Sequence, residues 1–258
     1  MKRLLGLVYG VVCYLLFLGV FAYLVGFVGD LVVPKSIERG SAAPLQVALL
    51  VNVGLLALFA VQHSVMARTW FKRWWTRRIP RHLERSTYVL LASLILAVVM
   101  WGWQPIPRSV WAVDHPVAAQ ALHVLFWAGW GIVLLSTFLI DHFRLFGLKQ
   151  VWAHFRGNEL ERPSFQTPGL YRVVRHPLYL GFLLAFWCTP EMSAGRLLLA
   201  GIWTGWILVA IHFEERELVD VHGDAYRAYR DRVRMLLPVP KGHPRPDRDA
   251  PSGERLST

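Results

Sequence analysis

Four long stretches of the sequence contain no charged residue. They cover residues 4–29, 45–67, 86–107 and 117–140. A helix needs about 20 apolar residues to cross the hydrocarbon core of a bilayer, and each stretch is long enough. Hydrophobic residues make up 55% of the chain and charged residues only 17%, which is more apolar than a soluble domain. The sequence therefore predicts a polytopic integral-membrane protein.

Two shorter apolar stretches follow towards the C-terminus. Residues 178–190 and 197–213 lie near or below the length of a full span, with a turn between them. We expect a short helical hairpin, re-entrant, tilted or made of two short spans. The predicted fold is thus all-α, a polytopic helical bundle of four long spans plus a short C-terminal helical hairpin. One integral-membrane domain should cover residues 1–238, and the polar tail at 239–258 should be disordered.

Positive charge is concentrated in alternate loops between the apolar stretches. Loops 68–85 and 141–177 are basic, whereas loops 30–44 and 104–119 are nearly neutral. Because basic loops tend to stay in the cytoplasm, this alternation predicts cytoplasmic N- and C-termini. Topology also accounts for the net charge of +11, so we expect contact with anionic headgroups of the lipid bilayer and no nucleic-acid partner.

The sequence gives no sign of a metal site. Its two cysteines, Cys13 and Cys188, both lie within apolar runs, and no CxxC spacing or His/Cys cluster accompanies them. We interpret both thiols as small hydrophobic side chains in the packing.

Two polar clusters flank the predicted hairpin. The segment RHPLYLG at 175–181 precedes it, and Glu214-Glu215 follow it. Folding the hairpin back on itself should bring the clusters together at one membrane face. Pro177 fits the first turn of a helix, with His176 at the N-cap. Polar and charged groups at the membrane boundary are costly to keep, which favours a bound polar ligand. Interfacial anchors or solvated carboxylates would also explain these residues.

The sequence after the hairpin is charged but periodic. Apolar or aromatic residues recur every three or four positions between residues 215 and 236, which predicts one amphipathic helix on the cytoplasmic membrane face. Its apolar stripe consists of Leu218, Val221, Ala225, Tyr229, Val233 and Leu236.

The two clusters together resemble a known C-terminal signature. RHPLYLG, an apolar hairpin and then EERELVDVHGDAYRAYRDRVRMLLP at 214–238 are similar to the isoprenylcysteine carboxyl methyltransferase superfamily. The resemblance implies a helical membrane bundle that binds S-adenosyl-L-methionine in a cytoplasmic pocket. The cofactor-binding residues that it implies are Arg175, His176, Pro177, Tyr179, Gly181, Glu214 and Glu215. The signature also includes Gly223, Tyr226 and Tyr229.

Elementary chemistry agrees with such a cofactor. Glu214 or Glu215 can meet its ammonium group or ribose hydroxyls, and Arg175 or His176 can meet its carboxylate. Tyr179 can donate a hydrogen bond or stack on the adenine. The cofactor carries the reactive methyl group, so the task of the protein is to orient it.

Three upstream segments narrow the resemblance. QHSVMAR at 62–68, ERSTYVL at 84–90 and STFLIDHF at 136–143 resemble bacterial membrane methanethiol S-methyltransferases. This resemblance implies an enzyme of the bacterial inner membrane that uses S-adenosyl-L-methionine to convert a small thiol, methanethiol, into dimethyl sulfide. Apolar thiols partition into lipid, which would explain a site within a membrane.

A thiol acceptor is mostly protonated near neutral pH and needs help to become a nucleophile. A base can remove the proton, or the neighbouring sulfonium can stabilise the thiolate. The candidate catalytic residues are His142, Asp141 and His63, since histidine titrates near neutral pH. Asp141 and His142 are adjacent and do not face the same direction on a helix. Each of the three also fits an ordinary role as an interfacial anchor or packing hydrogen bond.

Other functions remain open at this point. The acceptor could be a prenyl-cysteine, a hydrogen chalcogenide or another lipid-soluble molecule. A membrane reductase of related fold would use NADPH instead, and a non-catalytic membrane factor would use neither cofactor. The sequence does not predict an oligomeric state.

Overall fold

The computed structural model describes residues 1–41, 43–160 and 165–239, and the fold is almost entirely helical. Within these residues, five helices are long and apolar enough to cross a membrane. They are α1 (Lys2–Gly29), α2 (Leu45–Ala67), α4 (Arg81–Gly102), α5 (Pro116–Ile140) and α9 (Ala194–His222). The shorter α8 (Pro177–Trp187) is also apolar and precedes α9. The predicted polytopic helical bundle is therefore confirmed.

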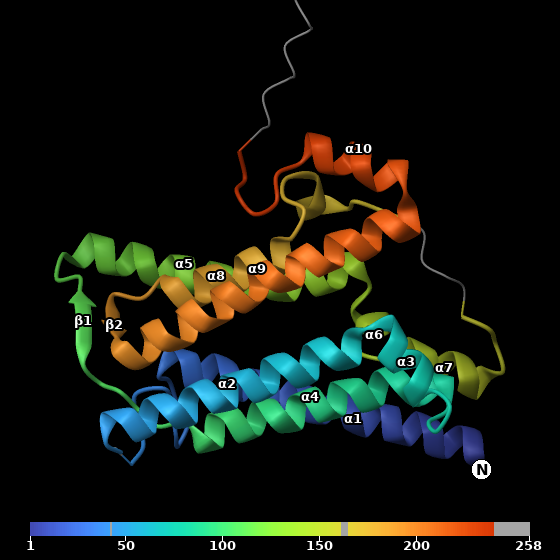
Figure 1. Cartoon of the computed structure of the whole chain (residues 1–258), viewed down its shortest axis with the longest axis horizontal. Coiled ribbons are helices and arrows are strands. Elements are labelled where there is room, and N and C mark those ends of the chain that lie inside the picture. The colour runs from blue at the N-terminus through green and yellow to red at the C-terminus, as the bar shows by residue number, and fades with distance from the viewer. Residues whose placement is uncertain (42, 161–164, 240–258) are drawn as a thin grey trace, which may run out of the picture.

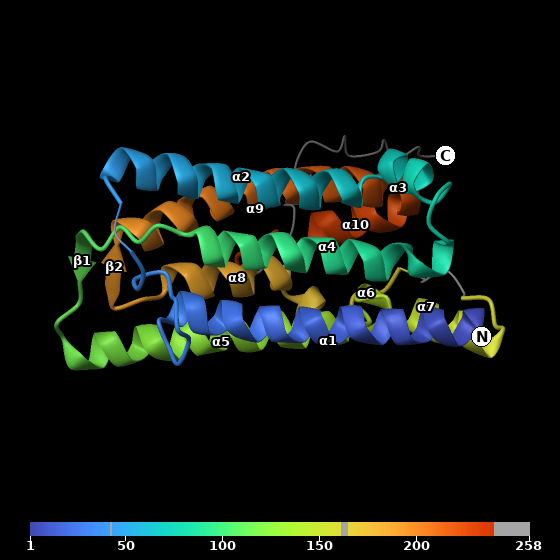
Figure 2. The same cartoon turned by 90° about the horizontal axis from the view of Figure 1, so that it is seen from below.

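The remaining elements lie at the two ends of this bundle (Figures 1 and 2). The short elements of one end are α3 (Thr69–Trp75), α6 (His142–Leu145), α7 (Leu148–Arg156), the 3-10 helix η1 (Gly169–Arg172) and α10 (Asp224–Arg232). The start of α1 lies there too, and we call it the basic end. The strands β1 (Ser109–Ala112) and β2 (Glu191–Ser193) form an antiparallel pair at the opposite end, the sheet end.

The hairpin of α8 and α9 is longer than the hydropathy predicts. Its second arm was expected over 197–213, but α9 extends to His222 and therefore contains Glu214-Glu215. The prediction of a single amphipathic helix over 215–236 is wrong, because α9 ends at His222 and α10 is a separate helix. Gly223 separates α9 from α10 with φ +54° and ψ −128°, a backbone conformation that glycine adopts without a steric penalty. Apart from Val239, the predicted polar tail lies outside the described residues.

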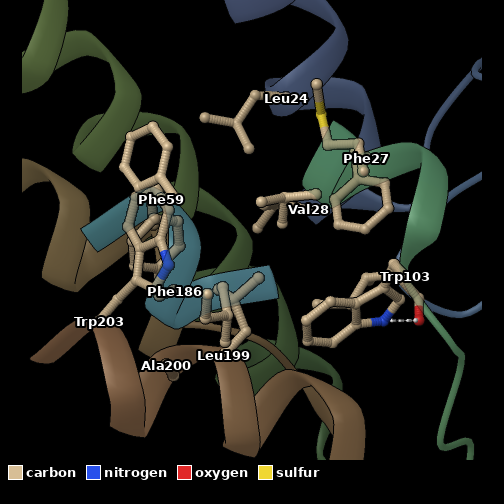
Figure 3. Packing of buried hydrophobic residues seen from close by; sticks show 14 of the residues in the cluster. Leu24, Phe27, Val28, Phe59, Trp103, Phe186, Leu199, Ala200 and Trp203 are labelled. Carbon is tan, nitrogen blue, oxygen red and sulfur yellow. Dashed lines mark hydrogen bonds between the residues drawn. The ribbon is translucent and has the colours of Figure 1, made fainter. Parts of the chain in front are cut away.

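The main hydrophobic core joins the long helices, and Figure 3 shows how its side chains pack. Phe59 of α2 stacks on Trp203 of α9, with ring centroids 5.5 Å apart and planes 5° from parallel. Trp103 is completely buried, and its indole N–H donates to the carbonyl of Ile37 at 3.2 Å. The stack of Phe59 on Trp203 holds α2 and α9 together about one turn before His63 on α2 and about three turns before Glu214 on α9.

Helices α5 and α8 approach each other closely at two glycines. A Cβ atom on Gly181 would lie 2.7 Å from the carbonyl oxygen of Gly129, and one on Gly129 would lie 2.7 Å from the backbone of Gly181 and Ala185. Small residues allow this contact between helix backbones, as is common in membrane bundles. The contact fixes α8, and with it the start of the helix where His176 lies.

Candidate functional site

The two polar clusters meet at the basic end, as the hairpin predicted. His176 Nε2 lies 3.0 Å from Glu215 Oε1, and Arg175 Nε donates to the same oxygen at 2.8 Å. The hydroxyl of Tyr179 donates to Glu214 Oε2 at 3.0 Å. Helix α8 begins at Pro177 with His176 as its N-cap, which confirms that part of the prediction. Residues about 40 positions apart in sequence thus form one continuous polar cluster.

Arg175 connects this cluster to the end of the described chain. Its Nη1 donates to the carbonyls of Arg230 at 3.1 Å and Val233 at 2.5 Å, in addition to the bond with Glu215. The backbone N–H groups of Arg175 and His176 donate to the carbonyls of Arg234 and Met235. Only 8% of the Arg175 side chain is exposed. The guanidinium therefore holds protein segments together, and its contacts give it a structural role.

The two adjacent glutamates have different surroundings. Glu215 is 14% exposed and bonded to Arg175 and His176, whereas Glu214 is 46% exposed. An open depression of about 470 Å³ adjoins Glu215 between α9 and α10. It is lined by His212, Glu215, Arg216, Val219, Asp220 and Arg230. Glu214 is thus the more exposed carboxylate, hydrogen-bonded to Tyr179, and Glu215 is the buried one that joins Arg175 and His176.

Three tyrosines of the basic end surround the glutamates and were not among the predicted site residues. Tyr226 is 1% exposed, and its hydroxyl is buried without a hydrogen-bond partner among the described residues. Burial and the nearby charge of Glu215 raise the pKa of Tyr226, and burial and Glu214 raise the pKa of Tyr171. Burial raises the pKa of Tyr229 to about 12, and its hydroxyl donates to the carbonyl of Tyr171 at 2.6 Å. All three hydroxyls are protonated at neutral pH and can act as donors.

The signature GDAYRAY in the sequence points to Tyr226 and Tyr229, but their burial against Glu215 depends on the fold. Gly181 packs against the backbone of α5, which by itself accounts for a small residue there, and its role at the cofactor stays a prediction. Pro177 is buried at the start of α8, and its role at the cofactor likewise stays a prediction. The polar side chains around Glu214 and Glu215 are thus Tyr171, Tyr179 and Tyr226, of which Tyr179 is hydrogen-bonded to Glu214.

The three candidate catalytic residues do not form one group. Asp141 pairs with Lys149 at 2.6 Å and with Arg144 at 3.4 Å. Burial alone would raise the pKa of Asp141, but the hydrogen bonds from Lys149 and from the backbone of Arg144 outweigh it and lower the pKa. His63 lies on α2, among aromatic rings of α2, α4 and α9.

Both ring nitrogens of His142 have partners. Nε2 lies 2.7 Å from the hydroxyl of Tyr14, and Nδ1 lies 2.8 Å from the hydroxyl of Thr137. The ring stacks on Phe138 with centroids 4.3 Å apart. Burial lowers the pKa of His142, so the ring is neutral at pH 7 and one nitrogen donates while the other accepts. These contacts join α1 to the end of α5.

Replacing His142 with alanine should destabilise the protein by about 2 kcal/mol or more, because it removes a buried ring and leaves two hydroxyls without their partner. A lower thermal midpoint in detergent, followed by tryptophan fluorescence, would show this. Tyr14→Phe removes only one of the two hydrogen bonds and is the matched control, with a smaller loss expected. Equal midpoints for His142→Ala and the unchanged protein would contradict the packing role.

Among the residues that the structure describes, no group of three or more His, Cys, Asp or Glu side chains is arranged to hold a metal ion. The site therefore consists of carboxylates, tyrosine hydroxyls and an imidazole at the boundary of a helical bundle.

Comparison with known proteins identifies the family. The model of a family described as a protein of unknown function (DUF1295) matches residues 49–233. The chain is 55% identical to methanethiol S-methyltransferase of Mycobacterium tuberculosis, over 94% of this chain and 100% of the relative. It is 55% identical to methanethiol S-methyltransferase 2 of Bradyrhizobium diazoefficiens, over 92% and 91%. It is 51% identical to methanethiol S-methyltransferase of Crocosphaera subtropica, over 92% and 93%.

No solved structure matches the chain at a significant level. The matched regions nevertheless include almost every helix described above, together with both polar clusters. The chain belongs to the DUF1295 family and, within the isoprenylcysteine carboxyl methyltransferase-like superfamily, to the methanethiol S-methyltransferases.

Proposed function

We propose that this protein transfers the methyl group of S-adenosyl-L-methionine to methanethiol and releases dimethyl sulfide. Relatives that are 50–55% identical over more than nine-tenths of the chain carry the name methanethiol S-methyltransferase, which supports the reaction and the acceptor. The five apolar spans support a membrane location. A membrane also suits a small thiol that dissolves in lipid.

The basic end of the bundle is assigned to the cytoplasm of a bacterial inner membrane. Loop 68–85 carries seven basic residues against one acidic residue, and it contributes α3 at this end. Positively charged loops remain preferentially on the cytoplasmic side. A charged, water-soluble cofactor would then reach the polar cluster from the cytoplasm, and the thiol would arrive through the apolar part of the bundle.

The buried hydroxyl of Tyr226 is the observation that carries the cofactor assignment. A buried donor without a protein partner costs about 1–3 kcal/mol, and a bound ligand or an ordered water can complete it. Tyr226 lies next to Glu215, and the exposed carboxylate of Glu214 is one residue away. This donor set fits S-adenosyl-L-methionine: Glu214 can bind its ammonium group or ribose hydroxyls, and Tyr226 can donate to one of its oxygens.

When bound, the cofactor supplies a methyl group on a positively charged sulfur. The residues of the chain then bind and orient it. Glu215, fixed by Arg175 and His176, holds the start of α8 against α9, so that Tyr179 and Glu214 keep their positions. Apolar surroundings favour transfer, because a thiolate that approaches the sulfonium loses charge as the reaction proceeds, whereas water would stabilise the separate ions.

Purified protein should bind S-adenosyl-L-methionine and not NADPH in a calorimetric titration, and membranes given methanethiol and cofactor should produce dimethyl sulfide in headspace gas chromatography. Glu214→Gln should weaken cofactor binding by about tenfold or more, since a charge-assisted hydrogen bond is lost. Glu217→Gln is the matched control, because Glu217 is 50% exposed on the same helix and pairs with Arg68 instead.

The same experiments separate the other functions. Binding of NADPH would indicate a reductase, and binding of neither cofactor would indicate a non-catalytic factor. Cofactor binding without production of dimethyl sulfide would indicate a different acceptor, a prenyl-cysteine or a hydrogen chalcogenide. Both acceptors can be tested in the same membranes.

A further inference from the structure

His63 is a half-buried titratable side chain that the cofactor cluster does not use. It lies one turn before the end of α2, and its Nδ1 is buried without a hydrogen-bond partner among the described residues. His142, by comparison, has partners for both nitrogens. An imidazole nitrogen that gives up water without gaining a protein partner costs free energy, and a bound molecule that hydrogen-bonds to it would recover that cost.

Aromatic rings from three helices surround this imidazole. The ring centroids of Phe59, Tyr88 and Trp206 lie 5.3, 5.2 and 5.4 Å from that of His63. The indole N–H of Trp206 donates to Ser64 at 3.0 Å, which fixes the ring. His63 as a whole is only half-buried, so the rings do not seal it. This surrounding suits a small apolar molecule with a sulfur atom, because sulfur makes favourable contacts with aromatic rings.

The aromatic surrounding of His63 connects to the cofactor cluster. Helices α2 and α9 run in the same direction, since Phe59 contacts Trp203, Ser64 contacts Trp206 and Arg68 lies over Phe213. Trp206 lies eight residues before Glu214 on α9, about 12 Å along the helix axis. Tyr88 touches His63 and is close enough to Tyr179 to act on it electrostatically, and Tyr179 donates to Glu214.

We propose that His63 accepts the proton of the acceptor thiol, and that the rings of Phe59, Tyr88 and Trp206 form the binding site for this small apolar thiol. The proposal rests on the methyl transfer proposed above. The S–H bond of the thiol breaks and its proton moves to a ring nitrogen of His63. The sulfur electron pair forms the new bond to carbon while the bond from carbon to the sulfonium breaks. The total charge of +1 moves from the sulfonium to the imidazolium, which later releases the proton to solvent.

The charged and titratable groups that face His63 come from α4. Arg85 acts on the imidazole electrostatically and lies over the ring of Tyr88, with its guanidinium carbon 5.0 Å from the centroid. Tyr88 of α4 is itself titratable and contacts the imidazole, and it acts electrostatically on Tyr179 of α8. Helix α9 contributes the indole of Trp206, which does not titrate in this range. A pH effect that follows the imidazole should therefore disappear when His63 is replaced.

His63→Gln keeps a polar side chain and removes the base. Affinity for S-adenosyl-L-methionine should stay unchanged, and turnover of methanethiol should fall about 100-fold or more, the usual contribution of a general base. The loss of turnover in His63→Gln should become smaller at high pH, where the thiol ionises by itself. It should also be smaller with a more acidic aromatic thiol as the acceptor. A purely structural residue would give a deficit that depends neither on pH nor on the acidity of the thiol.

His123→Gln is the matched control, because His123 is exposed on α5 and its replacement should change none of these quantities. Normal turnover by His63→Gln at every pH would overturn the proposal, while loss of cofactor binding or of dimethyl sulfide in the unchanged protein would overturn the proposed function instead. If His63→Gln does not fold, Phe59→Leu tests the binding site. A raised KM for methanethiol at unchanged cofactor affinity would support it, and an unchanged KM would contradict it.

Discussion

Replacing Glu215 with alanine is expected to unfold the basic end of the protein and to abolish methyl transfer. The carboxylate is 14% exposed and accepts from Arg175, which is 8% exposed, and it lies 3.0 Å from His176 Nε2. Removing one member of such a buried pair leaves the other charge without compensation and costs about 3–5 kcal/mol. Thermal unfolding in detergent, followed by tryptophan fluorescence, should show a midpoint lowered by many degrees.

The neighbouring carboxylates provide the controls for Glu215→Ala. Glu217 pairs with Arg68 while 50% exposed, so Glu217→Ala should cost no more than about 1 kcal/mol. Glu214→Gln should leave the midpoint of thermal unfolding nearly unchanged while it weakens cofactor binding. A Glu215→Ala variant as stable as Glu217→Ala would mean that the Arg175 and His176 contacts contribute little, and the division of roles between the two glutamates would be wrong.

The sequence predicts the bundle and the meeting of its polar clusters because both depend on local patterns. Apolar runs of span length give the long helices, and Pro177 marks the start of α8. The length of α9 was harder to predict, because hydropathy falls at Glu214 while the helix continues to His222. Gly223 shows the true end of the helix, and its position before a charged segment was a readable signal.

The roles of individual site residues depend on partners that lie far away in the sequence. The donors of Arg175 reach the carbonyls of Arg230 and Val233, and His142 meets Tyr14 across 128 positions. No local pattern shows these partners. The sequence therefore groups Arg175, Glu214 and Glu215 as equal cofactor residues, whereas in the structure Arg175 and Glu215 pair with each other and are mostly buried, and Glu214 is 46% exposed.

The same limit applies to Gly181. From the sequence alone, a glycine at this position could make room either for a ligand or for a neighbouring helix. Gly181→Ala should decide between them. The added Cβ would lie 2.7 Å from the carbonyl oxygen of Gly129 and 2.8 Å from the backbone nitrogen of Val133, so α5 and α8 would have to move apart. Overpacking against rigid backbone should cost about 3 kcal/mol or more, although alanine is the better helix former. Little folded protein should reach the membrane fraction.

Gly131→Ala on α5 is the matched control, because a Cβ there meets nothing within 4 Å. It should leave the thermal midpoint unchanged or raise it slightly, since helix propensity alone favours alanine over glycine by up to about 1 kcal/mol. A damaging Gly181→Ala beside a harmless Gly131→Ala places the effect in the contact between α5 and α8. A Gly181→Ala variant with a normal midpoint and weakened affinity for S-adenosyl-L-methionine would instead return Gly181 to the cofactor site, and α8 would then not depend on this contact for its position.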